Sequence, residues 1–234
     1  MKLKGKVVVV TGGFGTLGVA VGSAAANQGA AVALIDRAPA PQSSALPAVL
    51  SNALLLGNVD LSALASAETA LAAVVAKFGG IDVLANIAGA FRWQTLEGGS
   101  LDTWDFLYNV NVKTAAAAAK AALPHLIKRG GGRIVNIGAG AAAKAGAGMG
   151  AYTAAKAGVA KLTESLAEEV KDQHITVNAV LPSIIDTPPN RADMPTADFS
   201  RWVTPDSLAD VIVFLASDEA RAITGASIPV SGRV

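Results

Sequence analysis

Short apolar runs recur along the chain, and stretches with the spacing of amphipathic helices separate them. Val7–Val10 and Ala31–Ile35 contain no polar residue, which is typical of strands buried on both faces of a parallel sheet. Further strands are predicted at residues 53–59, 81–85, 133–137, 175–180 and 226–230. Helices are predicted after Gly18 and at residues 61–78, 102–128, 151–170 and 205–216. This alternation predicts one doubly wound, parallel α/β sheet of about seven strands with helices on both faces.

Punctuating residues indicate where some of these elements begin and end. Asp60 or Ser62 is expected to cap the helix at 61–78, and Gly79–Gly80 to end it. A bend is possible at Pro124 inside the long helix. An irregular or briefly helical connection is expected where prolines cluster, at Pro39, Pro41 and Pro47. A second proline-rich excursion covers residues 182–202.

A glycine-rich turn follows the first predicted strand. Gly13, Gly15 and Gly18 have the spacing G-x-G-x-x-G directly after that strand. We expect Gly13 to allow the tight turn, Gly15 to let a pyrophosphate approach, and Gly18 to let the helix pack closely. Asp36 ends the second strand, where such sites place the carboxylate that binds the ribose hydroxyls of NAD. These features predict a dinucleotide site, against the simpler interpretation that the glycines serve only a tight turn.

The composition limits the alternatives. No linker or charge block divides the 234 residues, so we expect a single domain at residues 1–234. A net charge of +1 without a basic patch gives no reason to expect nucleic acid. The absence of cysteine excludes disulfides, thiol catalysis and thiolate metal sites. His125 and His174 lack a paired ligand motif, so no metal site is expected.

The first residues resemble a membrane or export signal, because three lysines precede a long uncharged stretch. Glycines together with Asn27 and Gln28 interrupt that stretch, and cleavage near Ala24–Ala26 would remove the glycine turn. We therefore expect no membrane segment and a cytoplasmic location.

Tyr152 and Lys156 are four residues apart on a predicted helix, which places both side chains on one face. A neighbouring ammonium and a cationic nicotinamide both favour a phenolate, so the pKa of the phenol should fall from about 10 toward neutral pH. The pair is then suited to proton transfer. A surface tyrosine beside a solvated lysine is the simpler interpretation.

Together these motifs resemble the short-chain dehydrogenase/reductase family from Lys6 to Val230. The resemblance rests on the glycine loop, Asn86-Ile87-Ala88-Gly89, Asn111 and Tyr152-x-x-x-Lys156. It implies that Tyr152 is the acid/base, that Lys156 lowers its pKa and holds the nicotinamide ribose, and that Asn111 anchors a relay water. It also implies hydride transfer between a nicotinamide cofactor and a carbonyl or secondary alcohol of a small-molecule substrate. The family resemblance further suggests a homo-oligomer, a tetramer or dimer.

The choice between NAD and NADP depends on two neighbouring residues. Asp36 should repel the 2′-phosphate of NADP and so favour NAD, whereas Arg37 could turn toward such a phosphate. In place of the family's Asp-Val pair at the adenine, the chain has Asn58–Val59, whose amide oxygen could still accept the adenine amino proton. The residues expected to bind the cofactor are Gly12, Gly13, Phe14, Gly15, Thr16, Leu17, Asp36, Arg37, Asn58, Val59, Asn86, Ala88, Gly89, Tyr152, Lys156, Pro182, Ile185 and Thr187.

Three positions depart from the family pattern. Thr16 occupies the middle glycine position of the loop, and Ser183 stands where a glycine usually lies beside the nicotinamide. The catalytic serine, thirteen residues before the tyrosine, is replaced by Ala139. A hydrogen-bond donor to the substrate oxygen is therefore missing, unless Ser183 or a water replaces it. This loss leaves open a dinucleotide-binding protein with little catalysis.

The loop, Ala139 and the segment from Asp186 to Trp202 resemble the quinonoid dihydropteridine reductases, a branch of the same superfamily. That resemblance implies an alternative reaction, the reduction of a quinonoid dihydropteridine or a similar conjugated C=N ring. Asn86 and Asn111 fit the ordinary dehydrogenases better, so reduction of a carbonyl, or oxidation of a secondary alcohol, is the leading hypothesis.

Three further segments invite a structural interpretation. Residues 183–204, with Phe199 and Trp202, are interpreted as a substrate lid, in preference to a packed surface helix, because long loops at this edge of such sheets are often functional. Trp93 could line the same pocket or be a buried structural residue. The small residues Ala115–Ala119 could pack against the sheet or form a subunit interface.

Overall fold

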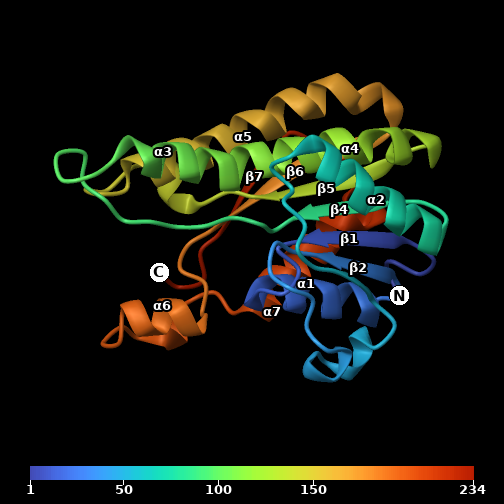
Figure 1. Cartoon of the computed structure of the whole chain (residues 1–234), viewed down its shortest axis with the longest axis horizontal. Helices are drawn as coiled ribbons and strands as arrows, with labels where there is room; N and C mark the ends of the chain where they lie inside the picture. The colour runs from blue at the N-terminus through green and yellow to red at the C-terminus, as the bar shows by residue number, and fades with distance from the viewer.

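The computed structural model describes residues 1–234 and contains one parallel sheet in the order β3-β2-β1-β4-β5-β6-β7 (Figure 1). The strands are β1 (Val7–Thr11), β2 (Ala31–Ile35), β3 (Leu54–Leu56), β4 (Val83–Asn86), β5 (Gly132–Ile137), β6 (Ile175–Pro182) and β7 (Ser227–Val230). The predicted doubly wound fold is confirmed, with all seven strands. The strand order reverses between β1 and β4, which opens a crevice at their carboxyl ends.

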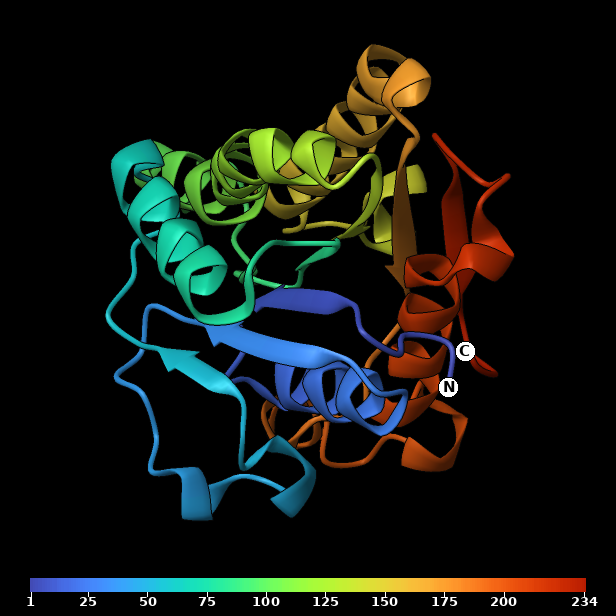
Figure 2. The same ribbon diagram turned by 90° about the vertical axis from the view of Figure 1, so that its right-hand side faces the viewer.

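Helices cover both faces of this sheet (Figure 2). One face carries α2 (Leu64–Phe78), α4 (Thr114–Lys128) and α5 (Gly150–Val170), and the other carries α1 (Thr16–Asn27) and α7 (Pro205–Ala216). Strand β1 shows why its valine run has no polar break. Val8 and Val10 belong to the core beneath α1 and α7, whereas Val7 and Val9 belong to the core beneath α2, α4 and α5.

The segment before α2 differs from the prediction. Helix α2 begins at Leu64 with Ala63 as its N-cap, so neither Asp60 nor Ser62 caps it. The Asp60 carboxylate instead accepts hydrogen bonds from the backbone N–H of Ser62, at 3.0 Å, and from its hydroxyl, at 2.7 Å. The side chain thus closes a local turn that competes with capping. Gly79 ends the helix as predicted, with a φ of 83°.

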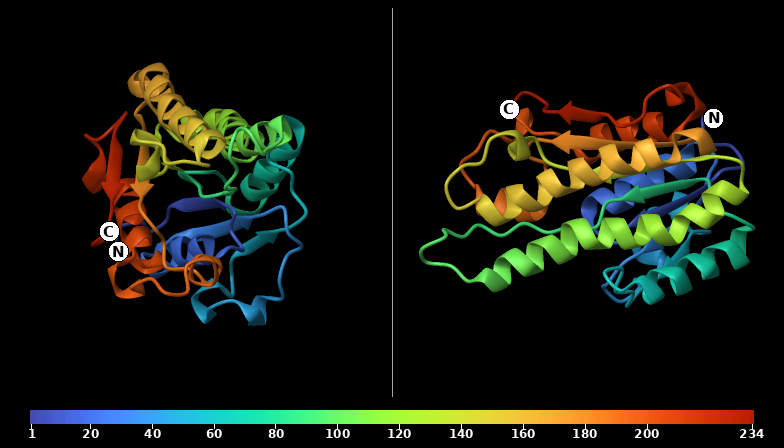
Figure 3. Two further views of the ribbon diagram at one scale, coloured as in Figure 1. Left: turned by 90° about the vertical axis from the view of Figure 1, so that its left-hand side faces the viewer. Right: turned by 90° about the horizontal axis from the view of Figure 1, so that it is seen from above.

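The predicted helix at 102–128 consists of three parts. α3 (Leu101–Tyr108) passes through a π-helical turn, η3 (Asn109–Lys113), into α4, and the three form one rod in Figure 3. Pro124 lies inside α4, which continues to Lys128. The interruption therefore comes at a wide turn and not at the proline, and such turns are often found at functional sites.

The remaining connections bear on the earlier expectations. The proline-rich stretch before β3 contains only two short 3-10 turns, at Ser43–Ala45 and Ala48–Leu50, as predicted. The second excursion contains α6 (Pro188–Asp193) and another short turn, at Phe199–Arg201. In α4, Ala118 and Ala119 are buried against α2 and the sheet, so this part of the alanine stretch packs inside the molecule. No helix has both the length and the apolar character needed to cross a membrane.

Candidate active site

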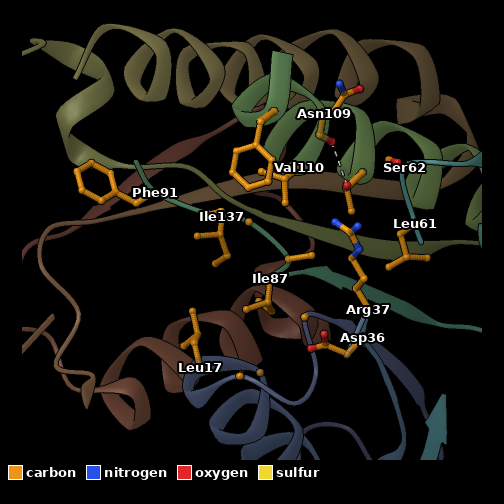
Figure 4. A pocket seen from close by; sticks show the side chains of 18 of the residues that line it. Leu17, Asp36, Arg37, Leu61, Ser62, Ile87, Phe91, Asn109, Val110 and Ile137 are labelled. Carbon is orange, nitrogen blue, oxygen red and sulfur yellow. Dashed lines mark hydrogen bonds between the residues drawn. The ribbon is translucent and has the colours of Figure 1, made fainter. Parts of the chain in front are cut away.

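A cavity of about 570 Å³ opens at the carboxyl ends of the central strands (Figure 4). Its lining comes from the glycine loop after β1, the ends of β2, β4 and β5, the turn η3, helix α5 and the segment after β6. Of the residues predicted to bind the cofactor, those that line it are Gly12, Gly15, Leu17, Asp36, Arg37, Val59, Ala88, Gly89, Tyr152, Lys156 and Ile185. One cavity therefore joins the predicted dinucleotide site to the predicted acid/base pair.

The other predicted residues lie outside the lining: Gly13, Phe14, Thr16, Asn58, Asn86, Pro182 and Thr187. Asn86 is buried and donates from Nδ2 to Oδ1 of Asn136 on β5, at 2.9 Å, so its side chain points into the sheet layer. Asn58 is exposed, with a φ of 58°. Thr187 caps α6, accepting at Oγ1 from the backbone N–H of Asn190.

The lining also contains residues that the sequence analysis did not predict to bind the cofactor: Gly18, Asp60, Leu61, Ser62, Ile87, Ala90, Phe91, Phe106, Asn109, Val110, Thr114, Ile137 and Asn190. Most are direct neighbours of motif residues, and extending each motif by two or three positions would have found them. Phe106 carries no such signal, because it lies on α3, five residues before Asn111.

The glycines of the loop have separable roles. Gly12 has a φ of +62°, so it is the residue that makes the left-handed turn, a role the sequence analysis gave to Gly13. A Cβ on Gly13 would lie 2.7 Å from Cβ of Leu34, and one on Gly18 would lie 2.1 Å from the carbonyl oxygen of Gly12. A Cβ on Gly15 would have no neighbour closer than 3.5 Å. Close packing thus requires Gly13 and Gly18, whereas Gly15 leaves space that a pyrophosphate at the start of α1 would fill.

Asp36 is fixed at the end of β2 by the backbone. Its carboxylate accepts hydrogen bonds from the N–H groups of Phe14 and Ala38, both at 3.0 Å. Phe14, predicted to bind the cofactor, therefore holds the carboxylate in place through its N–H. Arg37 lies beside Asp36 at the same end of the cavity (Figure 4). The open glycine loop and this fixed carboxylate fit the phosphates and the ribose of a dinucleotide.

Tyr152 and Lys156 lie in the first two turns of α5. The ammonium of Lys156 donates to the carbonyl oxygen of Ile137 at 2.8 Å, and its Nζ lies 5.9 Å from the centre of the Tyr152 ring. Burial lowers the pKa of Lys156 to about 8 and raises the pKa of Tyr152 to about 12. The expected fall of the tyrosine pKa is therefore wrong for the protein alone, because desolvation outweighs the nearby ammonium. At neutral pH the phenol keeps its proton.

Asn111 lies in the π-helical turn, and its side chain is almost fully buried. Its Nδ2 donates to the carbonyl oxygens of Leu107, at 2.9 Å, and Ala90, at 3.0 Å, while its Oδ1 accepts from the N–H of Ala90 at 3.3 Å. A Cβ on Gly89 would lie 2.6 Å from this Oδ1, so only glycine allows the close approach. The side chain thus holds the segment after β4 against α3 and does not line the cavity.

No replacement for the missing serine hydroxyl is found near Tyr152. Ala139 is buried, and the hydroxyl of Ser183 donates to the carbonyl oxygen of Ser231 at 2.8 Å. The side chain that lies against the phenol is Phe91, whose ring meets that of Tyr152 edge to face with centroids 4.9 Å apart. An aromatic ring therefore lies beside the phenol, and the family's serine hydroxyl is absent.

Two tryptophans differ from each other in environment. Trp93 is 62% exposed and outside the cavity lining, and its indole N–H donates to the carbonyl oxygen of Ala147 at 3.0 Å. Both expectations for Trp93 are therefore wrong. Trp202 is 7% exposed and packs against Phe199.

No cluster of side chains suited to a metal ion is found, including around the two histidines.

Comparison with known proteins adds three findings. The model of the short chain dehydrogenase family matches residues 6–197. The chain is 32% identical to 2-(S)-hydroxypropyl-CoM dehydrogenase 3 of Xanthobacter autotrophicus, over 99% of this chain and 97% of that protein. It is 35% identical to D-threitol dehydrogenase of Mycolicibacterium smegmatis, over 99% of this chain and 93% of that protein. The crystal structure of carveol dehydrogenase from Mycobacterium avium in complex with NAD is similar, with a TM-score of 0.85 and 26% identity, over 99% of this chain and 98% of that one.

Proposed function

This chain belongs to the short chain dehydrogenase family, and from that premise we propose how its cavity acts on a substrate. The protein is a nicotinamide-dependent oxidoreductase that acts on a carbonyl or an alcohol. We assign the acid/base role to Tyr152, with Lys156 beside it and the cofactor between the glycine loop and α5. The observation that carries this assignment is that Asp36, Gly15, Tyr152 and Lys156 all line one cavity.

When bound, the cofactor supplies or accepts the hydride. The Tyr152 phenol is protonated at neutral pH, because burial keeps its pKa at about 12, so it donates its proton to the carbonyl oxygen during reduction. The Lys156 ammonium, held by the carbonyl of Ile137, stabilises the phenolate that remains. Phe91 and Ile185 add apolar side chains to the lining of this cavity. In the oxidation direction the same phenolate removes the proton of the alcohol.

We propose NAD(H) as the preferred cofactor, because two backbone N–H groups hold the Asp36 carboxylate where a 2′-phosphate would meet it. Calorimetry should therefore show tighter binding of NADH than of NADPH. Asp36→Ala should narrow this preference by about tenfold, the effect of removing one charge contact. Asp60→Ala is a matched control, since it removes another carboxylate of the same cavity and should change both affinities alike. Equal or tighter binding of NADPH by the wild type would contradict the proposal.

A second candidate reaction is the reduction of a conjugated C=N ring, such as a quinonoid dihydropteridine. Three features favour it: the methyl group of Ala139 in place of a hydroxyl, the occupied hydroxyl of Ser183, and the aromatic face of Phe91 beside Tyr152. Steady-state oxidation of NADH with a ketone panel and with a quinonoid pterin distinguishes the two reactions. Turnover of neither would leave the third hypothesis, a dinucleotide-binding protein with little catalysis.

We also propose a substrate lid at residues 183–204 and assembly into a homo-oligomer. Ile185 and Asn190, both from the proposed lid, line the cavity, so hydrogen exchange of this segment should slow when NADH binds. Leu101, Trp104 and Tyr108 form an exposed apolar stripe on α3, which supports assembly through this helix. Sedimentation should show a tetramer or dimer, and a monomer would contradict the proposal.

A further inference from the structure

Two arginines of this chain lack a partner within the protein. Six of the eight arginines donate hydrogen bonds to a carboxylate or a backbone carbonyl, and these are Arg129, Arg133, Arg191, Arg201, Arg221 and Arg233. Arg37 and Arg92 make no such bond. Arg37 lines the dinucleotide end of the cavity, where the proposed cofactor explains it. Arg92 has no such explanation.

Arg92 is exposed and does not line the cavity itself, but it stacks on a residue of the cavity wall. Its guanidinium carbon is 3.7 Å from the centre of the Phe106 ring, and Phe106 lines the cavity. Phe106 packs with Val110 and Tyr152 against one small apolar cluster. The preceding residue, Phe91, lines the cavity (Figure 4), and its ring lies edge to face with the Tyr152 ring, with centroids 4.9 Å apart. The guanidinium is therefore linked to the region of the proposed acid/base by Phe106, which packs against the same cluster as Tyr152, and by its neighbour Phe91.

The backbone around Arg92 is fixed on both sides. Ala90 is held by two hydrogen bonds with the side chain of Asn111. Beyond it, the Trp93 indole donates to the carbonyl oxygen of Ala147, and the N–H of Gln94 donates to that of Gly148 at 2.8 Å. The backbone position of Arg92 is thus set by hydrogen bonds of the residues before and after it, and not by bonds of its own side chain. A guanidinium lying on a ring uses its flat face and leaves its N–H groups free at the edge.

No carboxylate of the protein neutralises this charge. The acidic residues of the cavity lining are Asp36, which lies beside Arg37 at the dinucleotide end (Figure 4), and Asp60, which lies between the lining residues Val59 and Leu61 in the sequence. The acidic residues nearest in sequence, Glu97, Asp102 and Asp105, form no ion pair with Arg92. We propose that Arg92 binds a carboxylate on the substrate, so that the enzyme selects anionic carbonyl compounds or alcohols over neutral ones. This inference rests on the proposed function, because it adds a residue that binds the substrate to the proposed active site.

The test compares one ketone with and without a negative charge. The probes are 4-oxopentanoate and its methyl ester, reduced with saturating NADH by the wild type, Arg92→Leu, Arg92→Lys and the control Arg221→Leu. The wild type should favour the carboxylate in kcat/KM by at least about tenfold, as one charge-assisted hydrogen-bond pair provides. Arg92→Leu should lose that preference because its KM for 4-oxopentanoate rises, while its kcat/KM for the methyl ester stays unchanged. Arg92→Lys should keep part of the preference. Arg221→Leu should behave like the wild type, because Arg221 bonds only to the carbonyl oxygen of Asp218.

Three results would overturn the proposal: no preference in the wild type, a preference that survives in Arg92→Leu, or a loss of NADH affinity in Arg92→Leu, which would make Arg92 a contact of the cofactor phosphates. If the wild type reduces neither ketone, the proposed function fails for these probes, and calorimetry of 4-oxopentanoate with the enzyme and NAD⁺ decides. Binding that Arg92→Leu weakens at least about tenfold supports the anion site, and no binding by the wild type overturns it.

Discussion

The two ends of the cavity are built in different ways. The dinucleotide end consists of backbone at the ends of β1 and β2, where Gly12, Gly13 and Gly18 have no room for a side chain. The other end, the substrate end beside Tyr152, contains side chains from long connections, such as Phe91 after β4 and Ile185 after β6. Backbone packing fixes the first end with little freedom to vary, whereas single substitutions can reshape the second. We therefore expect substitutions to be tolerated more readily at the substrate end than at the dinucleotide end.

Tyr152 lies between the two ends, and Tyr152→Phe should have the largest effect, because it should separate cofactor binding from turnover. The ring stays in place while the proton donor is lost, so turnover should fall by about a thousandfold and NADH affinity should stay nearly unchanged. Steady-state kinetics and calorimetry measure the two effects. The other tyrosine, Tyr108, is 56% exposed on α3, and Tyr108→Phe is the matched control. If Tyr152→Phe kept most of its activity on every substrate, the acid/base would have to be another group.

Within the dinucleotide end, two glycines should respond differently to the same substitution. In Gly18→Ala the new Cβ would lie 2.1 Å from a backbone oxygen, so unfolding experiments should show a loss of about 2 kcal/mol or more. In Gly15→Ala the nearest neighbour is at 3.5 Å and φ is −75°, so stability should change by less than about 1 kcal/mol. NADH binding should nevertheless weaken, because the methyl group occupies the space left for the phosphates. A cofactor affinity unchanged in Gly15→Ala would place the phosphates elsewhere.

At the substrate end, Ala139→Ser should restore the donor that the family pattern has at this position. One preorganised donor is worth about 3 kcal/mol at an oxyanion site, so even partial restoration should raise ketone reduction by at least about tenfold. Reduction of a quinonoid pterin should change little, because its electrons delocalise over the ring. Rates with both substrates, together with circular dichroism to check the fold, measure the effect. Unchanged ketone rates would mean that a substitute donor already exists and would remove the main support for the pteridine alternative.

The smallest expected effect concerns the pH dependence of stability. The folded-state pKa of Lys156, about 8, lies below its ordinary value of 10.5, so the unfolded chain binds more protons between these two values. Burial of Lys156 therefore destabilises the fold fully below pH 8, and this cost is relieved as the pH rises toward 10.5. Between pH 7.5 and 8.5 the free energy of unfolding should therefore increase by about 0.7 kcal/mol. Urea unfolding of the wild type and Lys156→Met should show a flatter profile in the variant, and identical profiles would contradict the assigned pKa.

Much of the fold was predictable, because local patterns determine it. The strand Ala31–Ile35 and the helix Pro205–Ala216 agree with the prediction at both ends, and β1 begins at Val7 as predicted but extends beyond the valine run to Thr11. The glycine loop and Asp36 were predictable for the same reason, since strain and close packing restrict which residues can stand there.

What could not be predicted depends on tertiary surroundings. Sequence spacing could not show that Asn86 points into the sheet layer, or that Asn111 is used to hold Ala90. The spacing correctly predicted that the ammonium of Lys156 lies near Tyr152. It could not show how deeply the Tyr152 phenol is buried, and this burial raises the pKa of the phenol where a fall was expected. The position of Arg92 on Phe106 depends on the π-helical turn, which has no sequence signature.

That turn also sets the rotational phase of α3 relative to α4. An α-helix closes hydrogen bonds from i to i+4, whereas a π-helical turn closes them from i to i+5 and so holds an extra residue. If Asn109–Lys113 were wound as regular α-helix, α3 would rotate about its own axis by roughly a quarter turn. Leu107, now fully buried, would turn out of the core, and Phe106 would leave the cavity wall. Deleting one residue from this turn would keep the phase, whereas adding one residue elsewhere in α3 as regular α-helix would shift it, so the side chain that α3 presents to the cavity depends on the length of the chain to a single residue.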